Sequence, residues 1–431
     1  MKNKIIGVDI GSERIVLSTP TDVLSDELYI PENNRLYNHV YRFINPSVYP
    51  PTKSLLTYNM KKDFDGYLIN QNNGYCSCKL LFKIFLSNYI KNKNLDCDKL
   101  VVTIPSSYHA IHTNELKEIY KESFKRDIVT IPTAEAVTIG DTKAKEKTLY
   151  IRLGRYSLDV WVAFRDKQID IPYYYGTMNI GMDDLFIKFA NLLWHTDIKD
   201  NKIENNIYNK SIDIAEKLIN DIRIEVPSVP NAQKKISWCI RKNLASSFIT
   251  SDLEAQIKDA MKLIIDSYSF DDSKFDIVFC GIGMLYDYAQ SIIRRIKWVH
   301  PPSEMRVLHG DCMARGAALY GENPGIIKNF YIRRTYSVGL ATNKCEVILK
   351  KGDILPNKSV KEYKITGTGS SLMFKLYAGR STDPQSNVFL KEFVIDSPKG
   401  VNPSSKLIID SNIGIDNCLD IKWKFTNLNF K

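Results

Sequence analysis

The chain has 431 residues, of which 44% are hydrophobic and 25% are charged. This length and composition fit a folded protein of several domains with a sizeable core. No run of about 18 apolar residues occurs, so we expect no membrane-spanning helix and no membrane partner.

Charge, cysteine spacing and the N-terminal residues narrow the class of protein further. The net charge is +10, and residues 326–431 hold 17 Lys and Arg against 9 Asp and Glu. No aromatic-basic motif accompanies this excess, so we interpret it as solvated surface and expect no nucleic-acid partner. The eight cysteines lack disulfide-framework spacing, and M-K-N-K leads into a predicted strand without room for a signal peptide. We therefore expect reduced thiols in a cytoplasmic protein.

Two segments share a strand-turn-strand pattern with glycine in the turn, Lys4 to Ser18 and Thr148 to Val162. A glycine turn lets backbone N–H groups approach an anion closely, which is one way proteins hold phosphate. Each hairpin opens one half of a region with α/β character. The pair therefore predicts a duplicated nucleotide-binding fold with phosphates held between its halves.

The elements between the two hairpins alternate in type. Residues 19–98 are polar and irregular, apart from a helical pattern over 79–89. A buried strand is predicted over 99–105, a helix over 107–124 and a strand over 127–131. Pro132 fits the first turn of the next helix. This alternation predicts a parallel or mixed sheet.

The second half continues the α/β pattern and then changes to alternating strands. Strands are predicted over 148–172 and 275–281, and Gly316 suits close packing of the last helix. Helices are predicted over 183–193, 211–224, 251–267, 285–296 and 310–320. After a boundary at 322–325, short alternating runs at 345–356, 371–379, 389–396, 406–410 and 418–425 predict an all-β sandwich.

Several short motifs occur in the order found in one known family. They are V-D-I-G-S (8–12), V-T-I-P-S-S-Y (102–108), I-P-T-A-E-A-V (131–137), L-G-R-Y-S-L-D-V (153–160), D-I-V-F-C-G-I-G (276–283) and G-D-C-M-A-R-G-A-A (310–318). On these motifs the chain resembles the seventy-kilodalton heat-shock chaperone family, within the actin-like and sugar-kinase ATPase superfamily. S-V-G-L, I-L-K-K-G-D-I-L-P and F-V-I-D-S-P resemble strands of that family's peptide-binding β-domain.

The resemblance implies an α/β fold in which a two-lobed actin-like ATPase domain, a duplicated ribonuclease-H-like unit, covers residues 1–322. Its lobes would span about 1–145 and 146–322. A linker is expected over 323–332, and a β-sandwich that resembles the peptide-binding domain over 333–431. We expect no α-helical lid.

The resemblance also implies the residues of a site for ATP or ADP. Lys53 stands at the position of the family's catalytic lysine, although a solvated surface lysine is the alternative. The cofactor-binding positions are Asp9, Gly11, Ser12, Gly154, Ser157, Asp159, Gly181, Arg223, Gly281 and Gly283.

Four departures from the family pattern affect catalysis and adenosine binding. Arg152 and Ile131 replace two carboxylates that order magnesium and the attacking water, which argues against magnesium and for impaired hydrolysis. Arg155 replaces a glycine of the second phosphate turn, and Leu285 replaces the arginine that stacks on the base. ATP binding is then expected to be weak or vestigial.

Two roles are open for Arg152. The first is that Arg152 and Arg155 neutralise phosphates in place of magnesium. The second is that Arg152 pairs with Asp9 or Asp159 and fills an empty cleft.

Peptide binding is the second activity that the resemblance implies. Matching the strands places Leu340 and Thr342 on one edge of a peptide pocket and Leu372 and Phe374 on another. The alternative is that these residues fill the core of the sandwich.

Three functions therefore compete. The first is a chaperone-like protein that binds extended polypeptides and possible co-chaperones with a vestigial nucleotide site. The second is a working ATP-dependent chaperone, and the third is a structural or assembly scaffold. The two lost carboxylates favour the first and third, whereas the apolar linker favours the first over the third.

Overall fold

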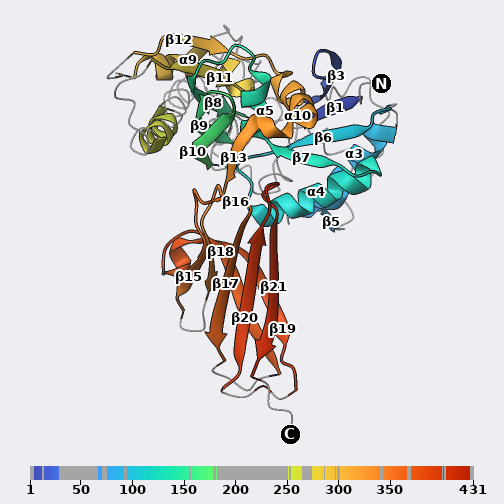
Figure 1. The fold of residues 1–431 in the computed structure, drawn as a ribbon, viewed down its shortest axis with the longest axis vertical. Helices are drawn as coiled ribbons and strands as arrows, with labels where there is room; N and C mark the ends of the chain where they lie inside the picture. The colour runs from blue at the N-terminus through green and yellow to red at the C-terminus, as the bar shows by residue number, and fades with distance from the viewer. Residues whose placement is uncertain are drawn as a thin grey trace, which may run out of the picture.

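The computed structural model shows a mixed α/β protein with an N-terminal part of sheets and helices and a C-terminal part of strands (Figure 1). No helix among the residues it describes is both long and apolar enough to cross a membrane. The described residues are 4–11, 14–28, 67–69, 75–91, 93, 95–154, 157–177, 181, 251, 254–264, 274–285, 287–296, 298, 301–339, 343–365, 370–399, 401 and 404–427.

The first sheet contains the first predicted hairpin and has the strand order β3-β2-β1-β6-β7. Its strands are β1 (Ile5–Ile10), β2 (Arg14–Ser18), β3 (Val23–Leu28), β6 (Lys99–Ile104) and β7 (Val129–Pro132). Strands β1 and β2 are antiparallel, whereas β1, β6 and β7 run parallel. Helices α3 (Cys78–Lys91) and α4 (Ala110–Phe124) share one apolar core with this sheet. The hairpin, strands and helices predicted here are confirmed.

Strand β3 lies in the stretch 19–98 that we expected to be irregular. A hydrogen bond from Thr19 N to Asp22 O (2.8 Å) closes a turn that brings β3 back onto β2. Val23 and Leu24 of this edge strand are about half exposed, so the sequence carries no buried alternation to reveal it. The short strands β4 (Tyr67–Ile69) and β5 (Tyr75–Ser77) also fall in this stretch and form a separate hairpin.

The second sheet contains the second predicted hairpin and has the order β12-β11-β8-β9-β10-β13-β16. Its strands are β8 (Lys147–Leu153), β9 (Leu158–Arg165), β10 (Ile169–Thr177), β11 (Asp276–Cys280), β12 (Glu304–Val307), β13 (Ile327–Tyr331) and β16 (Ile354–Leu355). The short helix η2 (Ile282–Leu285) and α9 (Asp287–Arg294) follow β11, and residues 254–264 are helical. The helices predicted over 183–193 and 211–224 lie outside the described residues.

The expected linker, residues 323–332, is part of this second sheet. It forms the turn η3 (Pro324–Ile326) and strand β13, which runs parallel to β10 and antiparallel to β16. Ile327 is buried, and the Phe330 ring lies 6.1 Å from that of Tyr320. Because apolar burial and strand pairing both favour this position, the segment is an integrated strand instead of a free connection.

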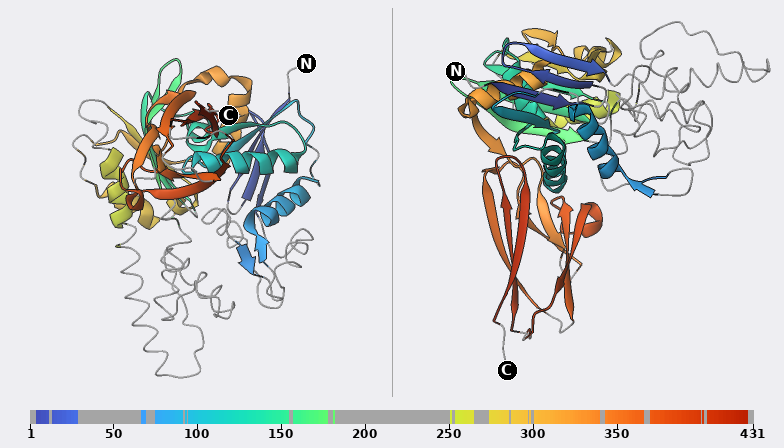
Figure 2. Two further views of the ribbon diagram at one scale, coloured as in Figure 1. Left: turned by 90° about the horizontal axis from the view of Figure 1, so that it is seen from below. Right: turned by 90° about the vertical axis from the view of Figure 1, so that its right-hand side faces the viewer.

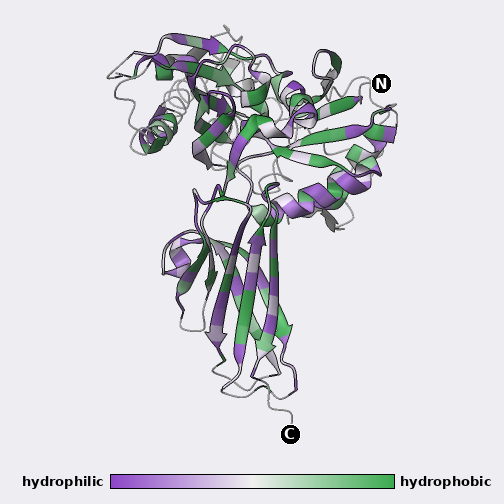
Figure 3. Cartoon of the chain, viewed as in Figure 1, coloured by the Kyte–Doolittle hydropathy of each residue, from purple (hydrophilic) through white to green (hydrophobic). Residues whose placement is uncertain are grey.

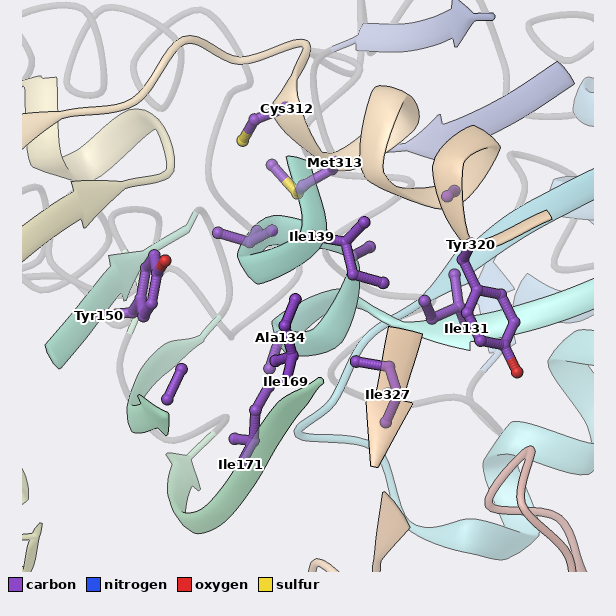
Figure 4. Packing of buried hydrophobic residues seen from close by; sticks show 14 of the residues in the cluster. Ile131, Ala134, Ile139, Tyr150, Ile169, Ile171, Cys312, Met313, Tyr320 and Ile327 are labelled. Atoms are coloured by element: carbon purple, nitrogen blue, oxygen red, sulfur yellow. The ribbon is translucent and has the colours of Figure 1, made fainter. Parts of the chain in front are cut away.

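Helices α5 (Thr133–Gly140) and α10 (Cys312–Glu322) lie between the two sheets and touch at backbone distance. A Cβ atom added to Gly316 would lie 1.8 Å from the carbonyl oxygen of Ala136, and one on Gly140 would lie 1.9 Å from that of Cys312. Gly7 of β1 approaches α10 in the same way. Figure 4 shows the apolar core around this crossing, to which both sheets contribute. The prediction for Gly316 is confirmed.

The C-terminal part consists of two sheets, shown face to face in Figure 2. The four-stranded sheet has the order β15-β14-β18-β19, with β14 (Tyr336–Gly339), β15 (Cys345–Leu349), β18 (Ser371–Ala378) and β19 (Val388–Asp396). The three-stranded sheet has the order β17-β20-β21, with β17 (Asn357–Lys364), β20 (Lys406–Ile413) and β21 (Leu419–Thr426). Hydropathy alternates along several of these strands (Figure 3), and their buried side chains form one core.

The N-terminal half of α4 holds the C-terminal part in place. Lys117 forms an ion pair with Asp416 in the β20–β21 turn. Asn114 Nδ2 donates to the carbonyl oxygen of Leu419 (2.5 Å), and the backbone N–H of Ala110 donates to the hydroxyl of Tyr336 (2.7 Å). These contacts join the core of the first sheet to the core of the C-terminal sheets, across the boundary that the sequence predicts at residues 322–325.

The crossing of α5 and α10 predicts a large cost for a small substitution. Gly316→Ala forces a methyl group into the Ala136 carbonyl and should lower the free energy of unfolding by about 1–3 kcal/mol or more. Gly325→Ala is the matched control, because that exposed glycine has only the Asn323 side chain within 4 Å of its added Cβ. Urea unfolding of both variants measures the difference, and equal stabilities would contradict the close approach.

His109, the residue before α4, predicts a loss of stability in mild acid. Burial, then the charges of Arg334 and His112, lowers its pKa to about 3. The unfolded chain therefore binds a proton first as pH falls, so stability is complete above about pH 6.5 and is lost toward pH 3. Between pH 7 and pH 5 the His109→Gln variant should lose about 2 kcal/mol less than the wild type. Urea unfolding at both pH values, with His309→Gln at an exposed position as control, checks this.

Candidate functional site

The expected cofactor-binding residues that the structure describes lie at the ends of β1, β8, β9 and β11. Asp9 belongs to β1 and Gly11 follows it, whereas Gly154 and Ser157 flank the turn between β8 and β9. Asp159 lies in β9, and Gly281 and Gly283 follow β11. Gly181 is buried at an isolated described position. Ser12, Lys53, Arg155 and Arg223 lie outside the described residues, as do Leu340 and Thr342.

Strands β8 and β11 are neighbours, so the glycines expected on the phosphate side and on the adenosine side of a nucleotide lie close together. Arg152 pairs in register with Cys280, the residue before Gly281. Gly281 has φ +82°, a conformation that favours glycine, and an added Cβ would lie 2.6 Å from the Leu153 carbonyl oxygen. The two predicted glycine positions therefore lie next to each other, with Arg152 beside both.

Arg152 forms an ion pair at the centre of this group. Its Nη1 donates to Asp159 Oδ2 (2.9 Å) and to Ser157 Oγ (3.1 Å), and Ser157 Oγ donates to the same Oδ2 (2.9 Å). The side chains of Arg152 and Asp159 are 18% and 4% exposed. Burial opposes the charge of Arg152, but Asp159 outweighs it and raises the pKa of the guanidinium, with smaller contributions from Cys280 and Asp9. Of the two roles open for Arg152, the geometry matches pairing with Asp159.

The guanidinium also covers the glycine of the turn. A Cβ atom on Gly154 would lie 3.4 Å from both terminal nitrogens of Arg152. The backbone N–H of Gly154 already donates to the Ser157 carbonyl (2.8 Å). An anion that approached this N–H would have to displace both the turn's hydrogen bond and the Arg152 side chain.

Tyr174 occupies the second oxygen of Asp159. Its hydroxyl donates to Oδ1 (2.5 Å), and burial, then the Asp159 carboxylate, raises the pKa of Tyr174 well above its usual value. The phenol therefore stays protonated and keeps donating. Gly176 makes room for this contact, because an added Cβ would lie 2.1 Å from the Tyr174 hydroxyl.

Asp9 is nearly buried and also has a partner. Thr103 Oγ1, near the end of β6, donates to Asp9 Oδ1 (2.5 Å). The position of the family's second carboxylate is Ile131, which is fully buried in the core shared with Tyr320 and Ile327 (Figure 4). No group of three or more carboxylate, histidine or cysteine side chains in the described chain is arranged to hold a metal.

These residues do not fit magnesium. Both oxygens of Asp159 accept hydrogen bonds, and a fixed cation already balances its charge. A divalent ion would have to displace the Arg152 guanidinium, and the positive charge of Arg152 would repel it. The residues that the structure describes here form a buried ion pair, and among them neither a metal-organising acid nor an open phosphate cradle is present.

A second buried ion pair lies behind the first. Arg333, which follows β13, pairs with Glu135 of α5, and their side chains are 4% and 1% exposed. The Arg333 guanidinium lies 4.6 Å from the centre of the Tyr174 ring, and its Nη1 donates to the Ile171 carbonyl (3.3 Å). Contacts therefore run from Arg152 through Asp159, Tyr174 and Arg333 to Glu135.

Sequence reasoning missed Tyr174, Glu135 and Arg333. One signal was available, because Glu135 is the only charged residue in the apolar helix T-A-E-A-V-T-I-G, and a charge there needs a buried partner. Nothing in the run Y-Y-Y-G distinguishes Tyr174 from its neighbours.

The expected peptide-contacting residues belong to the C-terminal core. Phe374 is 5% exposed and stacks on Phe393 with ring centres 4.7 Å apart. Leu372 is half-buried and packs against the same core. For these two residues the core-filling alternative matches the packing.

No model of a known protein family matches this sequence.

The Asp159 cluster predicts a measurable role for one hydroxyl group. Tyr174→Phe leaves Asp159 Oδ1 buried without its donor and should lower the free energy of unfolding by about 1–3 kcal/mol. Tyr320→Phe is the control, because Tyr320 is equally buried as a residue and its hydroxyl has no hydrogen-bond partner in the described structure. That variant should stay within about 0.5 kcal/mol of the wild type. Equal effects of the two substitutions in urea unfolding would show that the hydrogen bond contributes nothing.

Proposed function

We propose that the chain is a divergent relative of the seventy-kilodalton heat-shock chaperones that binds extended polypeptides and has a vestigial nucleotide site. The observation that carries this proposal is the Arg152–Asp159 ion pair, which is buried where the family organises magnesium and phosphate. In this proposal the protein is cytoplasmic, ATP or ADP binds weakly, and hydrolysis is impaired.

The arrangement of sheets supports the fold that this proposal needs. Two sheets, each beginning with a glycine-turn hairpin, meet at the crossing of α5 and α10, as expected for a two-lobed actin-like domain over residues 1–322. The two face-to-face sheets that follow support a β-sandwich over 333–431. Strand β13 requires one change, since residues 323–332 belong structurally to the first of these units.

The scaffold alternative draws support from a different observation. The Glu135–Arg333 pair and the Lys117–Asp416 pair both join the C-terminal part, or the segment leading to it, to the N-terminal part. Removing one partner of a buried pair typically costs about 3–5 kcal/mol, so the Glu135–Arg333 pair resists rearrangement, whereas the partly exposed Lys117–Asp416 pair contributes less. A scaffold would use this fixed arrangement, whereas a polypeptide-binding protein needs in addition an accessible apolar surface.

The vestigial site makes a prediction about magnesium. In calorimetric titrations of the wild type, the affinity for ATP should be no higher in magnesium than in EDTA. The reason is that Arg152 already supplies the positive charge that a metal ion would supply. Phosphate release should equal the rate without protein. Magnesium-dependent turnover near that of an intact family member would contradict the proposal and favour the working chaperone.

Removal of the guanidinium predicts the opposite response to metal. Arg152→Ala leaves the Asp9 and Asp159 carboxylates without their shared cation, so the melting temperature should fall and millimolar magnesium should restore part of it. Arg306→Ala is the matched control, because it exposes the single carboxylate of Asp141 in another place. That variant should lose stability without a response to magnesium. A similar magnesium response in both variants, or in neither, would refute the assignment of Arg152 as the resident cation.

A further inference from the structure

Four of the five most exposed large apolar side chains of the described residues lie on β18 and β19, and the fifth is Val360 of β17. Val394, Met373, Val388 and Phe389 are 62%, 59%, 56% and 53% exposed. Such exposure of several apolar residues in one place is typical of binding surfaces.

Three of these side chains lie on the outer face of the four-stranded sheet. Met373 pairs in register with Val394, and Tyr377 pairs with Phe389, whose ring centre lies 5.8 Å away. Both Met373 and Tyr377 alternate with buried residues of β18, so they point away from the core. The outer face therefore presents two apolar cross-strand pairs, and the ion pair of Lys375 with Glu392 (3.5 Å) lies between them.

Strand β19 is also the free edge of its sheet. It is nine residues long and has β18 on one side, with no described strand on the other. At the opposite edge, Lys361 of β17 donates to Glu346 of β15 across the two sheets (2.7 Å). A free edge presents a row of backbone N–H and C=O groups, and the ligand that matches such a row is another extended backbone.

Lys391 gives this edge an electrostatic preference. Its register partner Leu376 is fully buried, so Lys391 starts on the inner face, and its ammonium lies 5.6 Å from the centre of the Phe393 ring. No carboxylate in the described part of the chain forms an ion pair with Lys391, whereas the neighbouring Glu392 already pairs with Lys375. A strand that carries a carboxylate opposite Lys391 would complement the edge.

A second copy of β19 is a poorer match. Two identical antiparallel strands in one continuous sheet are related by an axis perpendicular to it, so residues of the same face must oppose each other. A register centred on Glu392 places that residue opposite its own copy, and a register centred on Lys391 does the same for the lysine. A register centred on Phe393 avoids both like-charge pairs, but it pairs only residues 390–396 and leaves Val388 and Phe389 unpaired. Like charges directly opposite each other destabilise a sheet.

We propose that the β19 edge binds an extended apolar polypeptide segment with a carboxylate opposite Lys391, by addition of a strand to the four-stranded sheet. The inference rests on the proposed polypeptide-binding function, but it assigns the binding to β19 instead of Leu340, Thr342, Leu372 and Phe374. The backbone of β19 supplies affinity, and Val394, Phe389 and Lys391 select the side chains of the segment.

The probe is an acetylated, fluorescein-labelled peptide of alternating valine and threonine with a central aspartate, used in anisotropy titrations of the full chain. A second peptide carries the same side chains with N-methyl groups on two adjacent central residues, which blocks both of its edges. We expect this second peptide to bind at least about tenfold more weakly. Unchanged affinity would show that backbone pairing is not involved and would overturn the inference.

Substitutions in β19 test the position of the site. Val394→Lys should weaken binding of the aspartate peptide about tenfold, whereas Val360→Lys, an equally exposed valine on β17, should leave it unchanged. Lys391→Glu should lose the aspartate peptide and gain a peptide with lysine at the same place. Melting temperatures near that of the wild type confirm that each variant is folded.

The outcomes separate this inference from the proposed function. Binding that both β19 variants leave intact would retain a polypeptide-binding protein and overturn the edge as its site. Absence of binding to every peptide would overturn both. A concentration-dependent dimer in analytical ultracentrifugation that Val394→Lys abolishes would show that a second copy occupies the edge, and would also overturn the inference.

Discussion

The Asp159 carboxylate is the point at which the side chains of three adjacent strands of the second sheet, β8, β9 and β10, are joined. It accepts hydrogen bonds from Arg152 of β8, Ser157 of the same hairpin and Tyr174 of β10. Burial of a carboxylate without such partners would cost several kcal/mol. All three donors therefore contribute to the stability of the buried Asp159 carboxylate. Through Tyr174, the same carboxylate sets the position of the ring against which Arg333 lies.

This dependence gives the β13 strand its place. Arg333 lies two residues after the end of β13, and its buried guanidinium contacts both the Glu135 carboxylate and the aromatic face of Tyr174. Helix α5 supplies Glu135, and it lies close enough because Gly140 and Gly316 let α5 and α10 meet at backbone distance. The close crossing, the second ion pair and the docked strand therefore support one another. A methyl group at the crossing would shift α5 and would therefore also disturb the Glu135–Arg333 ion pair after β13.

The sequence predicted features that depend on local pattern. The two hairpins, the strand-helix alternation from Lys99 to Gly140 and the glycine at the helix crossing follow from residue spacing and from the conformational freedom of glycine. The apolar segment at 326–330 was also visible, but it was interpreted as a linker. Its strand conformation depends on the open edge of β10, which is distant in sequence, and no local pattern reports such an edge.

In the candidate site, too, the sequence predicts the positions that depend on local motifs but not the side-chain partners that depend on the fold. Asp9, Gly154, Asp159 and Gly281 are predicted from motif positions, and the structure describes the last three on or beside the neighbouring strands β8, β9 and β11, with Asp9 on β1 of the other sheet. The partner of Arg152 was left open between Asp9 and Asp159, because sequence spacing alone does not determine side-chain direction. Strand β17 was missed because every second residue of N-K-S-V-K-E-Y-K is only half-buried. Its inward residues include Lys361, which bonds Glu346 of β15 where the edges of the two sheets meet, and polar side chains are tolerated at such an edge.

A resident guanidinium differs from a bound metal in one physical respect that bears on function. A metal ion can leave with a nucleotide and return with the next, so its charge can be gained and lost during a cycle. The charge of Arg152 is covalently fixed, and in this structure Asp159 and Asp9 both lie in its field. A site of this kind cannot report nucleotide exchange through metal release. In the proposed function, switching of the C-terminal part would then depend on the contacts at α4 and β13 or on a polypeptide bound to the C-terminal sheets.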